Sequence, residues 1–206
     1  MGIKVAPPSC FERKRKVMKA FLGVCLLLGW IAVGAATATA QEVVHAVSGT
    51  VSSIDPSANT IEIKSDDGSV QTFKDSTRAH VSLDVDKNFF ARLTPADKLS
   101  SKGTHVIVFY YGNNAVLTAV GLESLGSGPF ETSNGSVTKF EKHQRLLMLT
   151  SSSGIAEEFL ITPKTVAETA VGVVEGYKVD PEKGEQVRVT SSTLNGKKTA
   201  LYIYAK

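Results

Sequence analysis

The stretch VSGTVSSIDPSANTIEIKSDDGS (47–69) returns in a similar form as SNGSVTKFEKHQRLLMLTSSSGI (133–155). An offset of 86 residues places Gly49 on Gly135, and it aligns the apolar positions that follow. An offset of 81 aligns the end of each copy, with Gly103 on Gly184. Similarity at a fixed offset is typical of duplicated modules. We therefore predict a first module over 41–124, a linker over 125–134 and a second module over 135–206.

Apolar residues within each copy recur with a period of two. In TIEIK (60–64) apolar residues alternate with polar ones, and the runs HVIVFYY (105–111) and EQVRVTS (185–191) place valine at alternate positions. Such alternation predicts half-buried strands. Turn residues separate the runs, and Asn195-Gly196 is a strong signal for a type I′ hairpin. The predicted strands are 43–54, 60–65, 69–74, 103–111, 115–122, 133–140, 145–151, 156–161, 185–192 and 198–205.

The order of these strands indicates a fold. Each copy has three strands, a long connection and two more strands, and the first connection contains a short helix that starts at Thr94-Pro95 and ends near Ser100. This is the order of an OB-type barrel. We predict an all-β protein of two tandem five-stranded OB-like small barrels. The segment TVAETAVGVVEGYKVD (165–180) could be strand or helix, which leaves the closure of the second barrel open.

A short pattern in the first copy resembles a known kind of domain. It consists of Val-x-Gly-x-Val at 47–51, a glycine turn, a threonine-rich segment and Gly-x-x-Val-x-Val at 103–108. This pattern resembles secreted bacterial OB-like domains of unknown function, which often occur in tandem. The resemblance covers most of 47–122 and, more loosely, 133–204. It implies a fold and a compartment, but no chemistry.

The first 40 residues have the order of a secretory signal. Basic residues including Arg13 and Lys19 precede the apolar run AFLGVCLLLGWIAVGAA, and small residues end at Ala40. A basic, then apolar, then small-residue order is typical of a cleaved signal peptide. We expect a signal peptide over 1–40 and a periplasmic or secreted product that begins at Gln41. A retained anchor is the alternative, with membrane contact through this segment alone, and Met18 is an alternative start to Met1.

Removal of residues 1–40 changes the charge and the cysteine content. Six of 23 Lys and Arg residues and one of 20 Asp and Glu residues lie there, which leaves 17 basic and 19 acidic residues, a net charge of −2. A near-neutral protein lacks the basic surface that nucleic acids require, so we expect no nucleic-acid partner. Both cysteines, Cys10 and Cys25, leave with the signal. We therefore expect no disulfide and no thiolate metal site.

Motifs for chemistry are weak in the remaining sequence. Asp84, Asp86 and Asn88 have the spacing of a calcium loop, but Phe89 replaces the required glycine at its sixth position. The four histidines lack the short mutual spacing of zinc ligands: His45, His80, His105 and His143. Ser127 lies between glycines but lacks the frame of a nucleophile elbow. We expect no catalytic residue, no cofactor and no metal, and thus no enzyme.

A comparison of the two copies indicates a contact surface instead. Val106 and Val108 match Val187 and Val189, so this register is the predicted core face. The opposite register is apolar in the first copy but polar in the second. On the second strand of each copy the asymmetry is reversed, because the second copy has the apolar residues. Large exposed apolar surfaces usually bind something. The predicted partner-binding face consists of Ile107, Phe109, Tyr111, Leu146 and Met148. The alternatives are that these two surfaces cover each other, that they lie under the long link at 76–102, or that the strand register is wrong.

The sequence therefore favours a non-catalytic secreted or periplasmic protein of the cell envelope. We expect it to bind another macromolecule, such as a protein or an envelope component, or to self-associate as a homo-oligomer. The alternative is a periplasmic protein that binds a small ligand or a metal ion. The acidic loop at 84–88 and the histidines motivate this alternative.

Overall fold

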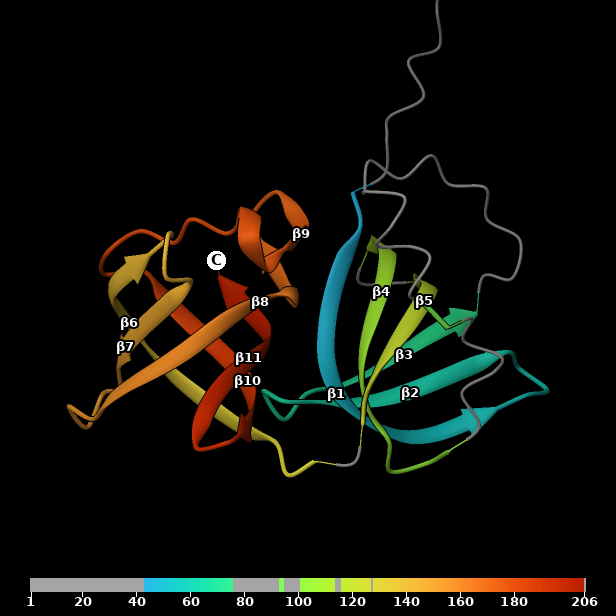
Figure 1. Ribbon diagram of the computed structural model, residues 1–206. Coiled ribbons are helices and arrows are strands. Elements are labelled where there is room, and N and C mark those ends of the chain that lie inside the picture. The colour runs from blue at the N-terminus through green and yellow to red at the C-terminus, as the bar shows by residue number, and fades with distance from the viewer. Residues whose placement is uncertain (1–42, 76–92, 95–100, 114–115, 127, 206) are drawn as a thin grey trace, which may run out of the picture. The chain divides into compact units, whose positions relative to one another are not determined.

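The computed structural model describes residues 43–75, 93–94, 101–113, 116–126 and 128–205. Two closed five-stranded β-barrels follow one another in the chain (Figure 1). Both belong to one compact unit, which spans Gln41–Lys206. The prediction of an all-β protein with two small barrels is confirmed. Within the described residues, no helix is long and apolar enough to cross a membrane.

The strands of the first barrel close in the order β1-β2-β3-β5-β4. Neighbouring strands are antiparallel except β3 and β5, which are parallel, and the pairing of β1 with β4 closes the barrel. The bounds are β1 (His45–Asp55), β2 (Thr60–Ser65), β3 (Val70–Asp75), β4 (His105–Asn113) and β5 (Val116–Gly126).

The second barrel repeats this order as β6-β7-β8-β11-β10, with β8 and β11 parallel. An additional short strand, β9, pairs with the end of β8, and the 3-10 helix η2 follows it. The bounds are β6 (Glu131–Glu141), β7 (Leu146–Thr150), β8 (Ala156–Thr169), β9 (Gly172–Glu175), η2 (Gly176–Lys178), β10 (Gln186–Leu194) and β11 (Lys197–Ala205).

The structure assigns strands in two segments that the sequence described as a linker or left ambiguous. The predicted linker over 125–134 is largely strand, because β5 continues to Gly126 and β6 begins at Glu131. The ambiguous segment 165–180 contains the end of β8, then β9 and η2. Its β8 residues pair with β11 and thereby close the second barrel. The predicted short helix lies outside the described residues, except for Thr94, which forms a bridge with Leu122.

Each barrel has its own apolar core, and equivalent residues occupy both. Ile61, Ile63 and Phe73 are at most 3 % exposed in the first core, and Leu147, Leu149 and Phe159 are at most 1 % exposed in the second. These residues match at the offset of 86. Burial of a large apolar side chain contributes roughly 1.5–3 kcal/mol. The period-two pattern of the sequence therefore identified the inward face of these strands.

The long first strand of each barrel bends, and a glycine allows the bend. In β1, residues 45–50 pair with β4, whereas residues 49–55 pair with β2. A Cβ atom at Gly49 would lie 2.4 Å from the carbonyl oxygen of Lys64, and one at Gly135 would lie 2.7 Å from that of Thr150. Backbone atoms in paired strands cannot move aside to accommodate a Cβ atom, whereas a flexible side chain can. Close approach of strands therefore explains why both copies have glycine at this position.

Candidate functional site

The two barrels share a third apolar cluster. Val44, Ala46, Ile107 and Phe109 of the first barrel pack with Val166 and Tyr202 of the second. Hydrogen bonds support this packing. The Tyr202 hydroxyl donates to the carbonyl oxygen of Ala46 at 2.7 Å, and the backbone N–H of Val173 donates to the carbonyl oxygen of Val44 at 2.9 Å. Strands β1 and β4 thus lie against β8, β9 and β11.

This cluster corrects one part of the predicted partner-binding face. Ile107 and Phe109 do lie opposite the core register of β4, but both are 0 % exposed. The expectation that they form an open surface is therefore wrong, because the second barrel covers them. The alternative that the two surfaces cover each other is closer to the structure, because residues of the second barrel cover the surface on β4. However, the covering residues come from β8 and β11, and not from Leu146 and Met148 on β7.

The other three residues of the predicted face do not join that cluster. Tyr111 at the end of β4 is partly exposed, and so are Leu146 and Met148 on the outer side of β7. Leu146 lines a shallow groove of about 640 Å³ together with Ile155 and Leu160. Ile155 is 62 % exposed. This groove lies entirely on the second barrel.

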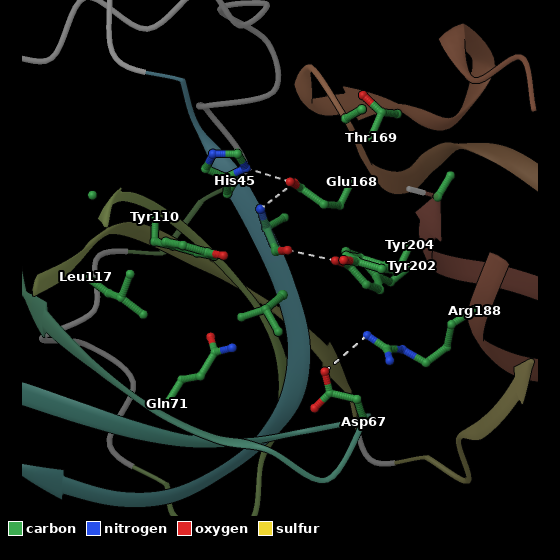
Figure 2. A pocket seen from close by; sticks show the side chains of 15 residues that line it. His45, Asp67, Gln71, Tyr110, Leu117, Glu168, Thr169, Arg188, Tyr202 and Tyr204 are labelled. Atoms are coloured by element: carbon green, nitrogen blue, oxygen red, sulfur yellow. Dashed lines mark hydrogen bonds and ion pairs between the residues drawn. The ribbon is translucent and has the colours of Figure 1, made fainter. Parts of the chain in front are cut away.

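A polar cleft opens beside the shared cluster (Figure 2). Its volume is about 450 Å³, which is within the range of about 300–1,000 Å³ for small-molecule sites. Strands of both barrels contribute to it, so neither barrel forms it alone. The side chains that line it include His45, Asp67, Gln71, Tyr110, Glu168, Arg188 and Tyr204.

The charged groups of the cleft are paired with groups of the protein. Nδ1 of His45 donates to Oε1 of Glu168 at 2.6 Å, and the backbone N–H of Ala46 donates to Oε2 at 2.7 Å. Across the cleft, the Arg188 guanidinium lies 3.5 Å from Oδ2 of Asp67. The same guanidinium lies over the ring of Tyr204, 4.9 Å from its centroid. These contacts position the side chains from both barrels.

Two buried polar atoms in the cleft have no hydrogen-bond partner among the described residues. They are Oε1 of Gln71, an acceptor, and Nε–H of Arg188, a donor. Figure 2 shows both side chains extending toward the cleft from opposite barrels. Buried polar atoms are seldom left unpaired in folded proteins. Such atoms in a cleft are therefore suited to bind a ligand or ordered water.

Tyrosine side chains supply further polar groups. Burial raises the pKa of Tyr110 above its ordinary value of 10.0, and the nearby Glu168 carboxylate acts in the same direction. The hydroxyl of Tyr110 therefore stays neutral at physiological pH. Its ring contacts His45 and Phe73, with centroid distances of 5.7 and 5.1 Å. A neutral phenol can both donate and accept a hydrogen bond.

A second polar network joins the barrels at the turn after β2. Ser48 and Thr190 donate their hydroxyls to Oδ2 of Asp66 at 2.5 and 2.6 Å, and Nε2 of His105 lies 3.3 Å from Oδ1. Burial raises the pKa of Asp66, but the nearby His105 and the hydrogen bonds from Ser48 and Thr190 outweigh burial and hold this pKa below its ordinary value of 3.8. Since Thr190 belongs to the second barrel, this carboxylate stabilises the contact between the barrels.

The residues considered for metal or nucleophilic chemistry do not form a centre in the described part of the chain. No group of three His, Cys, Asp or Glu side chains there could hold a metal ion. His45 and His105 belong to the two networks above, and His143 is exposed. The remaining candidates lie outside the described residues: Asp84, Asp86, Asn88, His80 and Ser127.

The cleft was not recognised from the sequence, although one signal for it was present. The outward positions of β10, including Arg188 and Thr190, match Ile107 and Phe109 of β4 at the offset of 81. All four residues lie where the barrels meet. The apolar outer face of β4 and the polar outer face of β10 therefore both contribute to the contact between the barrels. The unusual SDDGS turn (65–69) supplies Asp66 and Asp67 as partners. In comparisons with known proteins, no protein-family model and no curated sequence matches this chain.

Proposed function

We propose that this chain is an exported, non-catalytic protein that binds a small polar ligand in the cleft between its two barrels. The observation that carries this proposal is the pair of unpartnered polar atoms, Gln71 Oε1 and Arg188 Nε, in one cleft of about 450 Å³. The signal-like residues 1–40 support export to the periplasm or the medium.

Ligand binding should also strengthen the contact between the barrels. Gln71 and Tyr110 belong to the first barrel, whereas Arg188 and Tyr204 belong to the second. A ligand that touches both sets holds the barrels together, and it binds the folded chain better than the unfolded one. Such a ligand raises the free energy of unfolding by about 2.7 kcal/mol at 100 times its dissociation constant.

Thermal melts of residues 41–206 against a panel of small molecules test this function. The panel contains monosaccharides, disaccharides, amino acids, nucleosides, phosphate, sulfate and divalent metal ions. We expect at least one organic or anionic compound to raise the melting temperature in a concentration-dependent way. Failure of every such compound would contradict the proposal, and a shift with metal ions alone would favour the metal-binding alternative.

A second candidate function is association with a macromolecule or with another copy of this chain. The groove on the second barrel favours it, because Leu146, Ile155 and Leu160 contribute apolar side chains to its lining. Glu157, Glu158, Lys197 and Lys198 line the same groove with both signs of charge. In barrels with this strand order, the face of the second and third strands is a common binding surface, and here these strands are β7 and β8.

Sedimentation velocity of residues 41–206 tests the self-association form of this candidate. If the groove is an interface, the protein sediments as an oligomer at micromolar concentration and Ile155→Ser makes it monomeric. The matched control is Val171→Ser, because Val171 is also exposed, at 81 %, but lies outside the groove. A monomer at all concentrations would remove self-association as a function of this groove.

A further inference from the structure

The charges of the cleft disfavour a charged ligand. Glu168 receives hydrogen bonds from His45 and Ala46, and Oδ1 of Asp67 receives them from the N–H and the hydroxyl of Ser69. The Arg188 guanidinium faces Asp67. Among the described residues that line the cleft, the charged groups already contact polar or oppositely charged groups, so an ion that entered would lose its hydration with little gain in return. A neutral ligand avoids this cost.

The unpaired atoms of the cleft fit a ligand that both donates and accepts hydrogen bonds. Gln71 Oε1 needs a donor, and Arg188 Nε–H needs an acceptor. The phenol groups of Tyr110 and Tyr204 can take either role. A hydroxyl group has one donor and two acceptor positions, so a molecule with several hydroxyls can satisfy all of these groups.

The aromatic walls of the cleft fit a ligand with apolar faces and a polar rim. Tyr110 borders the cleft from β4, and Tyr204 borders it from β11. The guanidinium of Arg188 lies over the Tyr204 ring. Tyrosine combines an apolar ring with a polar end. The C–H faces and the hydroxyl rim of a sugar ring have the same combination of surfaces.

We infer that the cleft binds a neutral polyhydroxylated ligand, namely a mono- or disaccharide, between Gln71 and Tyr110 of the first barrel and Arg188 and Tyr204 of the second. This inference rests on the proposed ligand-binding function and adds the chemical class of the ligand. The volume of about 450 Å³ lies near the lower end of the range for small-molecule sites. It is suited to one or two sugar rings rather than a long oligosaccharide.

Calorimetric titration of residues 41–206 tests the ligand class. The probes are glucose, N-acetylglucosamine, maltose, cellobiose and chitobiose, and the comparison probes are glycine, glutamate, lysine, adenosine and phosphate. We expect a saccharide to bind and the charged probes to give no heat of binding. If a charged probe or adenosine binds in the cleft and no saccharide does, the inference is wrong but the proposed function stands. If none of the probes binds, both are contradicted.

Variants then locate the site. Tyr110→Phe and Gln71→Leu each remove hydrogen-bonding atoms at nearly constant volume, and each should weaken saccharide binding by roughly three- to ten-fold. Tyr111→Phe is the matched control, since Tyr111 follows on the same strand but does not line the cleft. The saccharide affinity of the Tyr111→Phe variant should equal that of the parent protein. Circular dichroism and melting temperature verify that each variant is folded. Saccharide binding that both cleft variants leave unchanged would overturn the inference.

Discussion

Replacement of Phe109 by alanine is expected to lower the free energy of unfolding by about 3–5 kcal/mol. The side chain is 0 % exposed and lies in the cluster that joins the two barrels. Its removal leaves a cavity beside Ile107, Val166 and Tyr202, and a packed interior closes such a cavity only in part. Urea unfolding of residues 41–206, followed by circular dichroism, measures the loss.

A control on an exposed strand position separates this effect from a general loss of β structure. Leu194 at the end of β10 is 67 % exposed, so Leu194→Ala should change the free energy of unfolding by no more than about 0.5 kcal/mol. If Phe109→Ala were equally mild, the packing of the two barrels against each other would be contradicted. Phe109 would then be a surface residue, as the sequence had first indicated.

Replacement of Asp66 by asparagine is expected to lower the free energy of unfolding at pH 7 by about 1.5–3 kcal/mol. The carboxylate accepts hydrogen bonds from Ser48 and Thr190 and lies beside His105. Asparagine keeps the size of the side chain but removes the negative charge. If the NH₂ group of asparagine took the place of Oδ2, it would face the hydroxyls of Ser48 and Thr190, which donate to that oxygen in the parent protein. Urea unfolding at pH 7 measures the difference.

The same carboxylate gives the stability a defined dependence on pH. The pKa of Asp66 is lower in the folded chain than its ordinary value of 3.8, so between these two values the unfolded chain binds more protons. The contribution of the Asp66 carboxylate to the free energy of unfolding is therefore present above pH 3.8 and is lost as the pH falls through the pKa of Asp66 in the folded chain. The difference in stability between the parent protein and Asp66→Asn should shrink over this window. A difference that stays constant down to pH 2 would contradict the role of the charge.

The sequence alone determined most of the strands and both barrel cores. Alternation placed Ile61 and Ile63 inside the first barrel and Leu147 and Leu149 inside the second, where all four are buried. Turn chemistry was equally informative: Asn195 and Gly196 have φ angles of 52° and 75°, as a type I′ turn requires. These features are local, because one strand and one turn contain the whole pattern.

The tertiary structure alone decided which outer faces are covered. At the end of β8, Thr165, Val166, Ala167 and Glu168 are buried in succession. Ala167 packs in the core of its own barrel, whereas Val166 and Glu168 face the first barrel. A strand that is buried on both sides lacks the alternation of apolar and polar residues. The sequence pattern of this segment therefore did not distinguish a strand from a helix.

The cleft depends on the tertiary structure for the same reason. His45 and Glu168 are 123 residues apart in the chain, and Arg188 meets Asp67 only where the barrels touch. Each residue by itself resembles an ordinary polar side chain on a strand or turn. Comparison of the two copies showed that the outer face of β4 and that of β10 differ. Packing of one barrel on the other explains that difference, since an apolar cluster and a polar cleft lie side by side in a single interface.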